Sequence, residues 1–148
     1  MIKVKICGIT RPDDAVAAVD EGADYLGLVF APSPRQVDEK QARLIMDSLP
    51  GFKNWVGVFV NADRFDVVKL CSSLRISFLQ LHGNETPEEC FFLQREGFQV
   101  IKAHRIQNAA SFDDVSMYET SYILFDSYSK HREGGTGKAF DWNLLKGR

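Results

Sequence analysis

The sequence has few cysteines, and they are not spaced as a metal site or a disulfide framework. Its 148 residues include three of them, Cys7, Cys71 and Cys90, so their number is odd and their spacings are wide. No CxxC pair is present, which argues against a zinc site. We therefore expect no metal, no disulfide framework and a reducing compartment.

The sequence also lacks a basic excess, a long apolar run and a signal peptide. Its 18 Lys and Arg are balanced by 20 Asp and Glu, for a net charge of −2. Nucleic acids and membrane surfaces usually select a concentrated basic patch, and a membrane span needs roughly 20 apolar residues in a row. The N-terminal MIKVKICGIT has no apolar signal core. We expect a cytoplasmic protein that binds neither nucleic acid nor membrane.

What the sequence does contain is one short unit that recurs six times. Apolar runs rich in β-branched and aromatic residues alternate with amphipathic segments, and no flexible linker divides them. The predicted strands are Ile2–Ile6, Tyr25–Phe30, Trp55–Val60, Ser77–Leu81, Gln99–Ala103 and Ser121–Phe125. One predicted helix begins near Thr10, and others cover Asp38–Leu49, Asp63–Leu70 and Asn108–Met117. A further predicted helix runs from a Thr86–Glu89 capping box to Gly97. This alternation predicts an α/β domain over residues 1–148 with parallel strands and right-handed crossovers.

Two architectures are compatible with that order of elements. A doubly wound sheet usually carries GxGxxG after its first strand, whereas this chain has Cys7-Gly8-Ile9-Thr10 there. A (β/α)8 TIM barrel needs eight units, which at this spacing amounts to roughly 180–200 residues. We predict the barrel, with about six of its eight units present in this chain.

In such a barrel the chemistry lies at the carboxyl ends of the strands. Cys7 ends the first predicted strand, where a cysteine is either a base or nucleophile with a lowered pKa or a small buried hydrophobe. Asp126 ends the sixth, where a partly buried carboxyl can act as a general acid. Cys71 and Cys90 fall within helical patterns and are predicted to belong to the core.

Three further positions are candidates for contact with a substrate. Arg35 lies in a proline-bounded loop after the second strand and offers a rigid fork that suits a carboxylate, although most loop arginines are simply solvated. His82 ends the fourth strand, where it either touches substrate or satisfies a backbone group. Gly135 lies in the loop GGTGK, which does not meet the P-loop pattern and which we predict to be a mobile loop over the barrel mouth.

Taken together, these segments resemble one enzyme family. KVKICGIT, GADYLGLVF, SPRQV, VGVFVN, LQLHG, VIKA and LFDS followed by GGTGKAFDW stand in the order and spacing of phosphoribosylanthranilate isomerases. The resemblance covers the whole chain and implies an Amadori rearrangement of N-(5-phosphoribosyl)anthranilate in tryptophan biosynthesis. It implies Cys7 as general base, Asp126 as general acid and Arg35 as the partner of the anthranilate carboxylate. It implies no metal, nucleotide or organic cofactor.

The family pattern continues past FDW for two more strand–helix units, which carry the phosphate site. The resemblance therefore implies a chain without that site, with two exposed sheet edges and a tendency to self-associate. Two alternatives remain open on the sequence alone. One is another phosphosugar-binding barrel, similar to indoleglycerol-phosphate synthase. The other is a catalytically weak or inactive remnant that at most binds a ligand or a partner.

Overall fold

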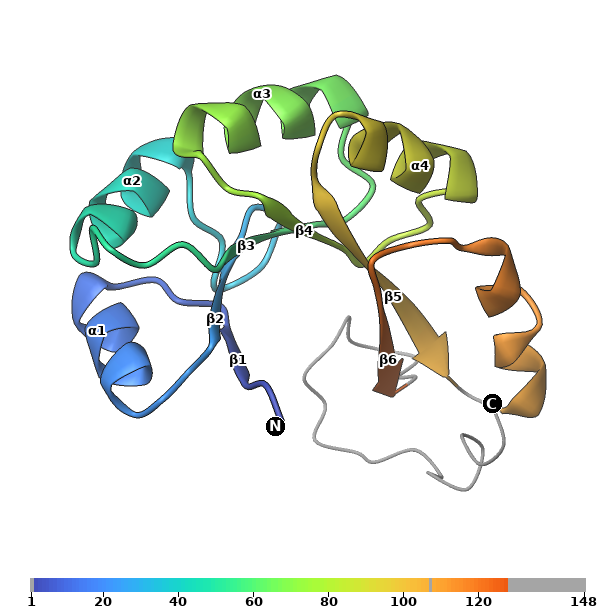
Figure 1. Cartoon of the computed structure of the whole chain (residues 1–148), viewed down its shortest axis with the longest axis horizontal. Helices are drawn as coiled ribbons and strands as arrows, with labels where there is room; N and C mark the ends of the chain where they lie inside the picture. The colour runs from blue at the N-terminus through green and yellow to red at the C-terminus, as the bar shows by residue number, and fades with distance from the viewer. Residues whose placement is uncertain (1, 107, 128–148) are drawn as a thin grey trace.

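Six parallel strands form one curved sheet with helices along its outer side (Figure 1). The computed structural model describes residues 2–106 and 108–127. The strands are β1 (Lys5–Cys7), β2 (Tyr25–Val29), β3 (Trp55–Phe59), β4 (Phe78–Leu81), β5 (Gln99–Ile106) and β6 (Tyr122–Ser127). Their spatial order is their chain order, β1 to β6. A doubly wound sheet reverses its order at a switch point, so the sequential order identifies the barrel arrangement.

The helices begin and end where local chemistry favours it. They are α1 (Pro12–Asp20), α2 (Glu39–Asp47), α3 (Arg64–Leu74) and α4 (Pro87–Arg95). The Asp38 and Asp63 carboxylates cap α2 and α3, and Thr86 with Glu89 forms the predicted capping box of α4. Arg75 ends α3 in the left-handed conformation with φ 56°. None of the helices in the described part of the chain is long and apolar enough to cross a membrane.

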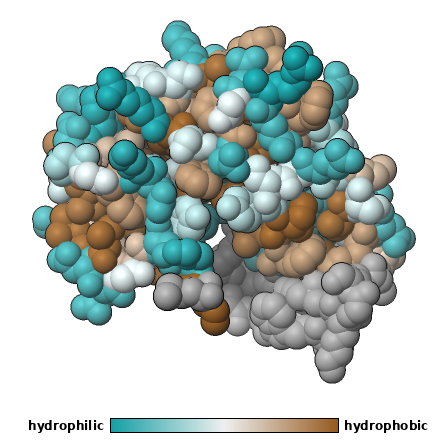
Figure 2. Space-filling view, in the orientation of Figure 1, coloured by the Kyte–Doolittle hydropathy of each residue, from teal (hydrophilic) through white to brown (hydrophobic). Residues whose placement is uncertain are grey.

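The two faces of the sheet are packed differently. Its convex face contacts the helices through the main apolar core, which includes Leu26, Leu28 and Leu79, all fully buried. The concave face carries a small second cluster of Val29, Ala31 and Val58 with Cys7 and Val60 against it. The space-filling view shows hydrophilic residues along much of the outer helical rim (Figure 2). The main core therefore lies between the sheet and its helices, and the concave side carries a smaller apolar cluster beside polar groups.

Strands β1 and β6 are the two edges of the described sheet. Ile2, Val4 and Ile6 are 88%, 46% and 42% exposed beside the first edge, and Tyr122 is 51% exposed on the other. The main-chain groups of an edge strand and its apolar side chains are a template for pairing with another segment.

The predicted order of elements is confirmed, with differences at several boundaries. β1 begins at Lys5 rather than Ile2, and β5 runs on to Ile106, because β6 pairs with it over that length. Helix α3 extends to Leu74, which is buried with Cys71 in the core. The helix predicted over Asn108–Met117 is wrong. That segment forms two 3-10 turns, Ala109–Phe112 and Val115–Met117, and Asn108 N–H donates to the Ser111 hydroxyl, a local bond that competes with α-helix.

Candidate active site at the carboxyl ends of the strands

A hollow of about 390 Å³ lies on the concave side at the carboxyl ends of the strands. Four of the predicted site residues line it: Cys7, Arg35, His82 and Asp126. They come from β1, the loop after β2, the end of β4, and β6. Residues up to 119 positions apart in sequence thus share one cavity, as the parallel arrangement of strands requires. Gly135, the fifth, lies outside the described residues.

Cys7 is placed by glycines on either side of it. It pairs in register with Gly27 of β2, where an added Cβ would lie 2.9 Å from the Cys7 sulfur. The chain then turns at Gly8, whose φ of +84° is rarely adopted by other residues. The N–H groups of Gly8 and Ile9 both donate to the Gly27 carbonyl, at 2.9 and 3.1 Å. These contacts direct the thiol into the hollow rather than into the helical layer.

Arg35 closes over the same turn. Its Nη1 donates to the Cys7 carbonyl at 2.9 Å, and an added Cβ on Gly8 would come within 2.7 Å of that nitrogen. The guanidinium lies at the exposed rim of the hollow. A planar cation so placed can take a carboxylate at the cavity mouth.

His82 and Asp126 are joined directly. His82 Nε2 lies 3.1 Å from Asp126 Oδ2, and the two side chains are 16% and 20% exposed. On its other side, His82 Nδ1 lies 3.1 Å from Nε2 of Gln80, and the Gln80 carbonyl oxygen accepts a hydrogen bond from Lys5. The Asp126 carboxyl group therefore belongs to a chain of polar side chains that crosses the concave face from β1 to β6.

Lys5 is a half-buried member of that chain. Burial lowers its pKa, and the neighbouring Cys7 acts in the opposite direction, raising the pKa by charge attraction and hydrogen bonding. Lys5 and Cys7 are two residues apart on β1 and so point to the same side of the sheet. The Lys5 ammonium is a cation placed where it would stabilise a Cys7 thiolate.

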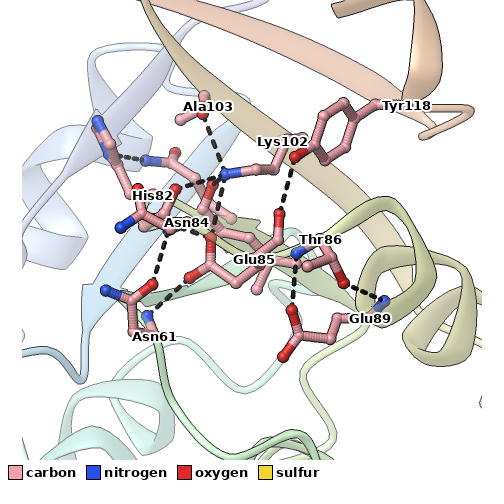
Figure 3. A network of polar contacts seen from close by, with 12 residues as sticks. Asn61, His82, Asn84, Glu85, Thr86, Glu89, Lys102, Ala103 and Tyr118 are labelled. Carbon is pink, nitrogen blue, oxygen red and sulfur yellow. Dashed lines mark hydrogen bonds and ion pairs between the residues drawn. The ribbon is translucent and has the colours of Figure 1, made fainter. Parts of the chain in front are cut away.

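A second polar cluster lies on the convex side of β4 and β5 and was not predicted. Lys102 and Glu85 are 2% and 6% exposed, with Nζ and Oε2 3.0 Å apart. Glu85 also accepts from the N–H groups of Asn61 and Gly83, at 2.8 and 2.9 Å. Tyr118 donates to the Glu85 carbonyl at 3.1 Å, so the cluster joins the ends of β3, β4 and β5 to the segment before β6 (Figure 3).

This cluster supports the loop that carries His82. The Lys102 ammonium also donates to the Gly83 carbonyl at 2.8 Å, next to His82 in the chain. Gly83 has no room for a side chain, because an added Cβ would collide with the Asn61 amide oxygen. The sequence signal that could have indicated this cluster is Lys102, a lysine within an apolar strand pattern, with His104 and Arg105 following it.

The other two cysteines are buried in the core. Cys71 and Cys90 are 0% and 1% exposed, and burial raises the pKa of their thiols to about 12 and about 11. Their predicted place in the core is confirmed. Among residues 2–106 and 108–127, no three His, Cys, Asp or Glu side chains are grouped as a metal site would need.

The connectivity and the cavity define the class of protein. Parallel strands in sequential order, helices on one side, and a cysteine, a histidine and an aspartate around a hollow at the carboxyl edge are the features of a (β/α)8-barrel enzyme that acts on a small molecule. About six of the eight units of that barrel are present.

Comparison with known proteins identifies the family. The model of N-(5'-phosphoribosyl)anthranilate isomerase matches residues 4–148, and the chain belongs to this family. The N-(5'-phosphoribosyl)anthranilate isomerase of Pseudomonas fluorescens is 46% identical over 97% of this chain and 69% of its own length. The crystal structure of the enzyme from Thermotoga maritima has 39% identity and a TM-score of 0.88, over 98% of this chain and 70% of that one.

A further solved structure of the family contains a ligand. It is a phosphoribosylanthranilate isomerase in complex with reduced 1-(o-carboxyphenylamino)-1-deoxyribulose 5-phosphate. It has 38% identity and a TM-score of 0.80, and the match covers 87% of this chain and 66% of that chain.

Proposed function

We propose that this chain carries the general acid and the general base of a phosphoribosylanthranilate isomerase. With them it converts N-(5-phosphoribosyl)anthranilate to 1-(2-carboxyphenylamino)-1-deoxyribulose 5-phosphate. The proposal rests above all on the shared hollow, which has Cys7, Asp126 and Arg35 in its lining. Family membership supports the reaction, and the complex of the relative supports a phosphosugar as ligand. As a biosynthetic enzyme with free thiols at Cys7, Cys71 and Cys90, it is proposed to work in the cytoplasm.

In the proposed mechanism Asp126 acts first, as an acid. It donates a proton to the ring oxygen of the furanose, the ring C1′–O bond breaks, and a Schiff base forms between C1′ and the anthranilate nitrogen. That cation makes the C2′ hydrogen acidic. The thiolate of Cys7 then removes the C2′ proton, and the resulting enolamine tautomerises to the ketone. An acid and a base facing one sugar are sufficient, so no group from outside the chain enters the steps.

Arg35 is proposed to hold the anthranilate carboxylate. Its position at the rim, anchored to the Cys7 carbonyl, would place the aromatic ring at the mouth and the sugar between Cys7 and Asp126. His82 is proposed to contact Asp126 rather than to take part in the proton transfer itself. Gly135 is proposed to contact the substrate, on the resemblance to the family alone.

The test is turnover of freshly prepared phosphoribosylanthranilate by the folded 148-residue chain. We expect Cys7→Ala and Asp126→Asn each to lower kcat by about 100-fold or more, because each removes one of the two proton-transfer groups. Asp47→Asn, on the exposed end of α2 away from the hollow, is the matched control and should turn over like the parent chain. Unchanged turnover in both Cys7→Ala and Asp126→Asn would show that the mechanism is wrong.

The alternative function is ligand binding without catalysis. The chain spans 69% of the length of the Pseudomonas fluorescens relative, and a folded chain with this hollow can bind a ligand without catalysing its conversion. Isothermal titration with the reduced product analogue separates the two cases. Binding without turnover, weakened by Arg35→Ala, would favour the binding role.

Self-association through the sheet edges is proposed as well. The apolar side chains beside β1 and the exposed Tyr122 of β6 favour pairing with a second copy. Size-exclusion chromatography across a range of concentrations tests this, and a compact monomer at every concentration would exclude it.

A further inference from the structure

The hydrogen bonds of the polar chain on the concave face run in one donor-to-acceptor direction, because Lys5, its first member, can only donate. Lys5, at the start of β1, has an ammonium group with three N–H donors and no acceptor. It reaches across the concave face to Gln80 of β4, 75 residues away. Because Lys5 can only donate, Gln80 must turn its carbonyl oxygen toward Lys5.

That choice determines what Gln80 offers to His82. With the carbonyl oxygen toward Lys5, the amide NH₂ lies 3.1 Å from His82 Nδ1. An amide NH₂ is a donor only, so Nδ1 must accept and carries no proton. Gln80 is 3% exposed and lies within the sheet, so water has little access with which to offer it another arrangement.

The proton of the His82 ring then lies on the opposite nitrogen, Nε2. A neutral imidazole that accepts at Nδ1 is protonated at Nε2, and Nε2 faces Asp126 Oδ2 at 3.1 Å. His82 therefore donates to the aspartate. In the reverse tautomer, Nε2 would be an acceptor and would compete for the proton of Asp126.

We propose that Lys5 and Gln80 are positioning residues that hold His82 as the neutral Nε2–H tautomer, so that it orients Asp126 without taking its proton. The catalytic consequence rests on the proposed function, in which Asp126 is the acid. The tautomer of His82 does not rest on it, since the hydrogen-bond chain exists in the free protein.

The structure favours this arrangement further through the surroundings of the chain. Arg105 Nη2 donates to the His82 carbonyl at 3.4 Å, and Lys102 donates to the carbonyl of the next residue, Gly83. The backbone of His82 is thereby fixed by two cations on the neighbouring strand β5. The ring is left to be set by Gln80 on one side and Asp126 on the other.

The experiment is ring-nitrogen NMR of the folded 148-residue chain labelled with ¹⁵N-histidine near pH 7, with the His82 signals assigned by their loss in His82→Asn. The nitrogen shift separates a protonated ring nitrogen from an unprotonated one, and it is insensitive to packing changes that leave protonation unaltered. We expect the parent chain to show Nδ1 unprotonated and Nε2 protonated. A parent chain with Nδ1 protonated would overturn the proposal.

Gln80→Glu is the decisive variant because it changes one donor into an acceptor at nearly constant volume. The new carboxylate still accepts from Lys5, but it can only accept from His82, so Nδ1 should become protonated. Gln94→Glu, on α4 and away from the hollow, is the matched control and should leave the His82 signals in place. An unchanged ring in folded Gln80→Glu would refute the role of Gln80.

Lys5 is tested by a pair of variants, which also serve if Gln80→Glu does not fold. Lys5→Met removes the donor and frees the Gln80 amide to turn, so we expect a mixture of His82 tautomers. Lys5→Arg keeps a donor and should restore the single Nε2–H form. A single Nε2–H form in Lys5→Met would overturn the role of Lys5.

Kinetics then separate this inference from the proposed function. If the parent chain turns over substrate, Gln80→Glu should lower kcat by roughly 10- to 100-fold with a smaller change in KM, because only the acid step is disturbed. If the parent chain shows no turnover while the NMR result holds, the proposed function fails and the inference about His82 stands.

Discussion

The two polar clusters lie on opposite faces of the sheet near the end of β4, yet they are built differently. On the convex face, Glu85 is bound by the main-chain N–H groups of Asn61 and Gly83 and by Lys102, and the ion pair is 6% and 2% exposed. On the concave face, Asp126 meets the side chain of His82, with both at the edge of an open hollow. The Glu85 carboxylate is held in place by main-chain donors and a buried lysine, whereas Asp126 faces an imidazole at a cavity that a ligand can enter.

Within the short stretch from His82 to Glu85, one residue contacts the candidate site and the others belong to the buried cluster that supports it. The His82 side chain contacts the concave cluster, and Gly83 and Glu85 belong to the convex one. The buried pair joins four chain segments and so determines where the His82 main chain lies. On the concave side, the side chains of Gln80 and Asp126 contact the two nitrogens of the His82 ring.

The largest expected effect is on the buried pair. Lys102→Met removes the cation that pairs with the buried Glu85 carboxylate, and we expect the free energy of unfolding to fall by about 3–5 kcal/mol. Urea denaturation measures it. Lys40→Met, an exposed lysine on α2, is the control and should change little. A loss below about 1 kcal/mol for Lys102→Met would mean that the two clusters do not differ in the way described.

A smaller effect is expected where the convex cluster meets the segment before β6. Tyr118→Phe removes one neutral hydrogen bond to the Glu85 carbonyl and keeps the ring beside Lys102, whose Nζ lies 5.9 Å from the ring centroid. We expect a loss of about 1 kcal/mol by the same denaturation. Tyr122→Phe, on the exposed end of β6, is the matched control. Equal losses in both variants would place Tyr118 outside the cluster.

The smallest effect is a dependence on pH from His104, whose ring packs on Tyr118 with centroids 4.8 Å apart. Burial, and then the charge of Lys102, lower the pKa of His104 from its ordinary value of 6.5, while Asp114 raises it. The unfolded chain therefore binds the proton more readily. The contribution to stability is fully present above about pH 6.5 and is lost as the pH falls through the folded-state pKa.

Comparing the parent chain with His104→Gln across pH 7 to 5 isolates this contribution. The parent should lose stability faster than the variant as the pH falls below about 6.5. If the two chains respond in parallel, the neutral His104 adds nothing that depends on pH.

Much of the fold could be predicted from the sequence, because it depends on short-range patterns. Apolar runs gave the six strands, and the Thr86–Glu89 box gave the start of α4, since capping needs only residues within one turn. The segment Asn108–Met117 was misjudged, because local hydrogen bonds of Asn108 and Ser111 compete with helix in a way that apolar spacing does not reveal.

The candidate site was predictable in part. Cys7, Arg35, His82 and Asp126 were predicted because each follows a strand, and parallel strands bring their carboxyl ends to one edge. Their roles remain predictions. Lys5 and Gln80 were missed because they lie within strands, and Glu85 and Lys102 because nothing in either local sequence indicates the other.

The sequence by itself therefore determined the repeated unit, its parallel order and the residues at the strand ends, since these depend on periodicity and turn chemistry over a few neighbouring residues. The tertiary structure decided which buried donor meets which acceptor. Lys5 donates to Gln80 and Lys102 donates to Glu85. The His82 ring lies between Gln80 and Asp126, with one nitrogen facing each. Such pairings depend on register and curvature summed over several strands, and a hydrogen bond is lost within an ångström of displacement.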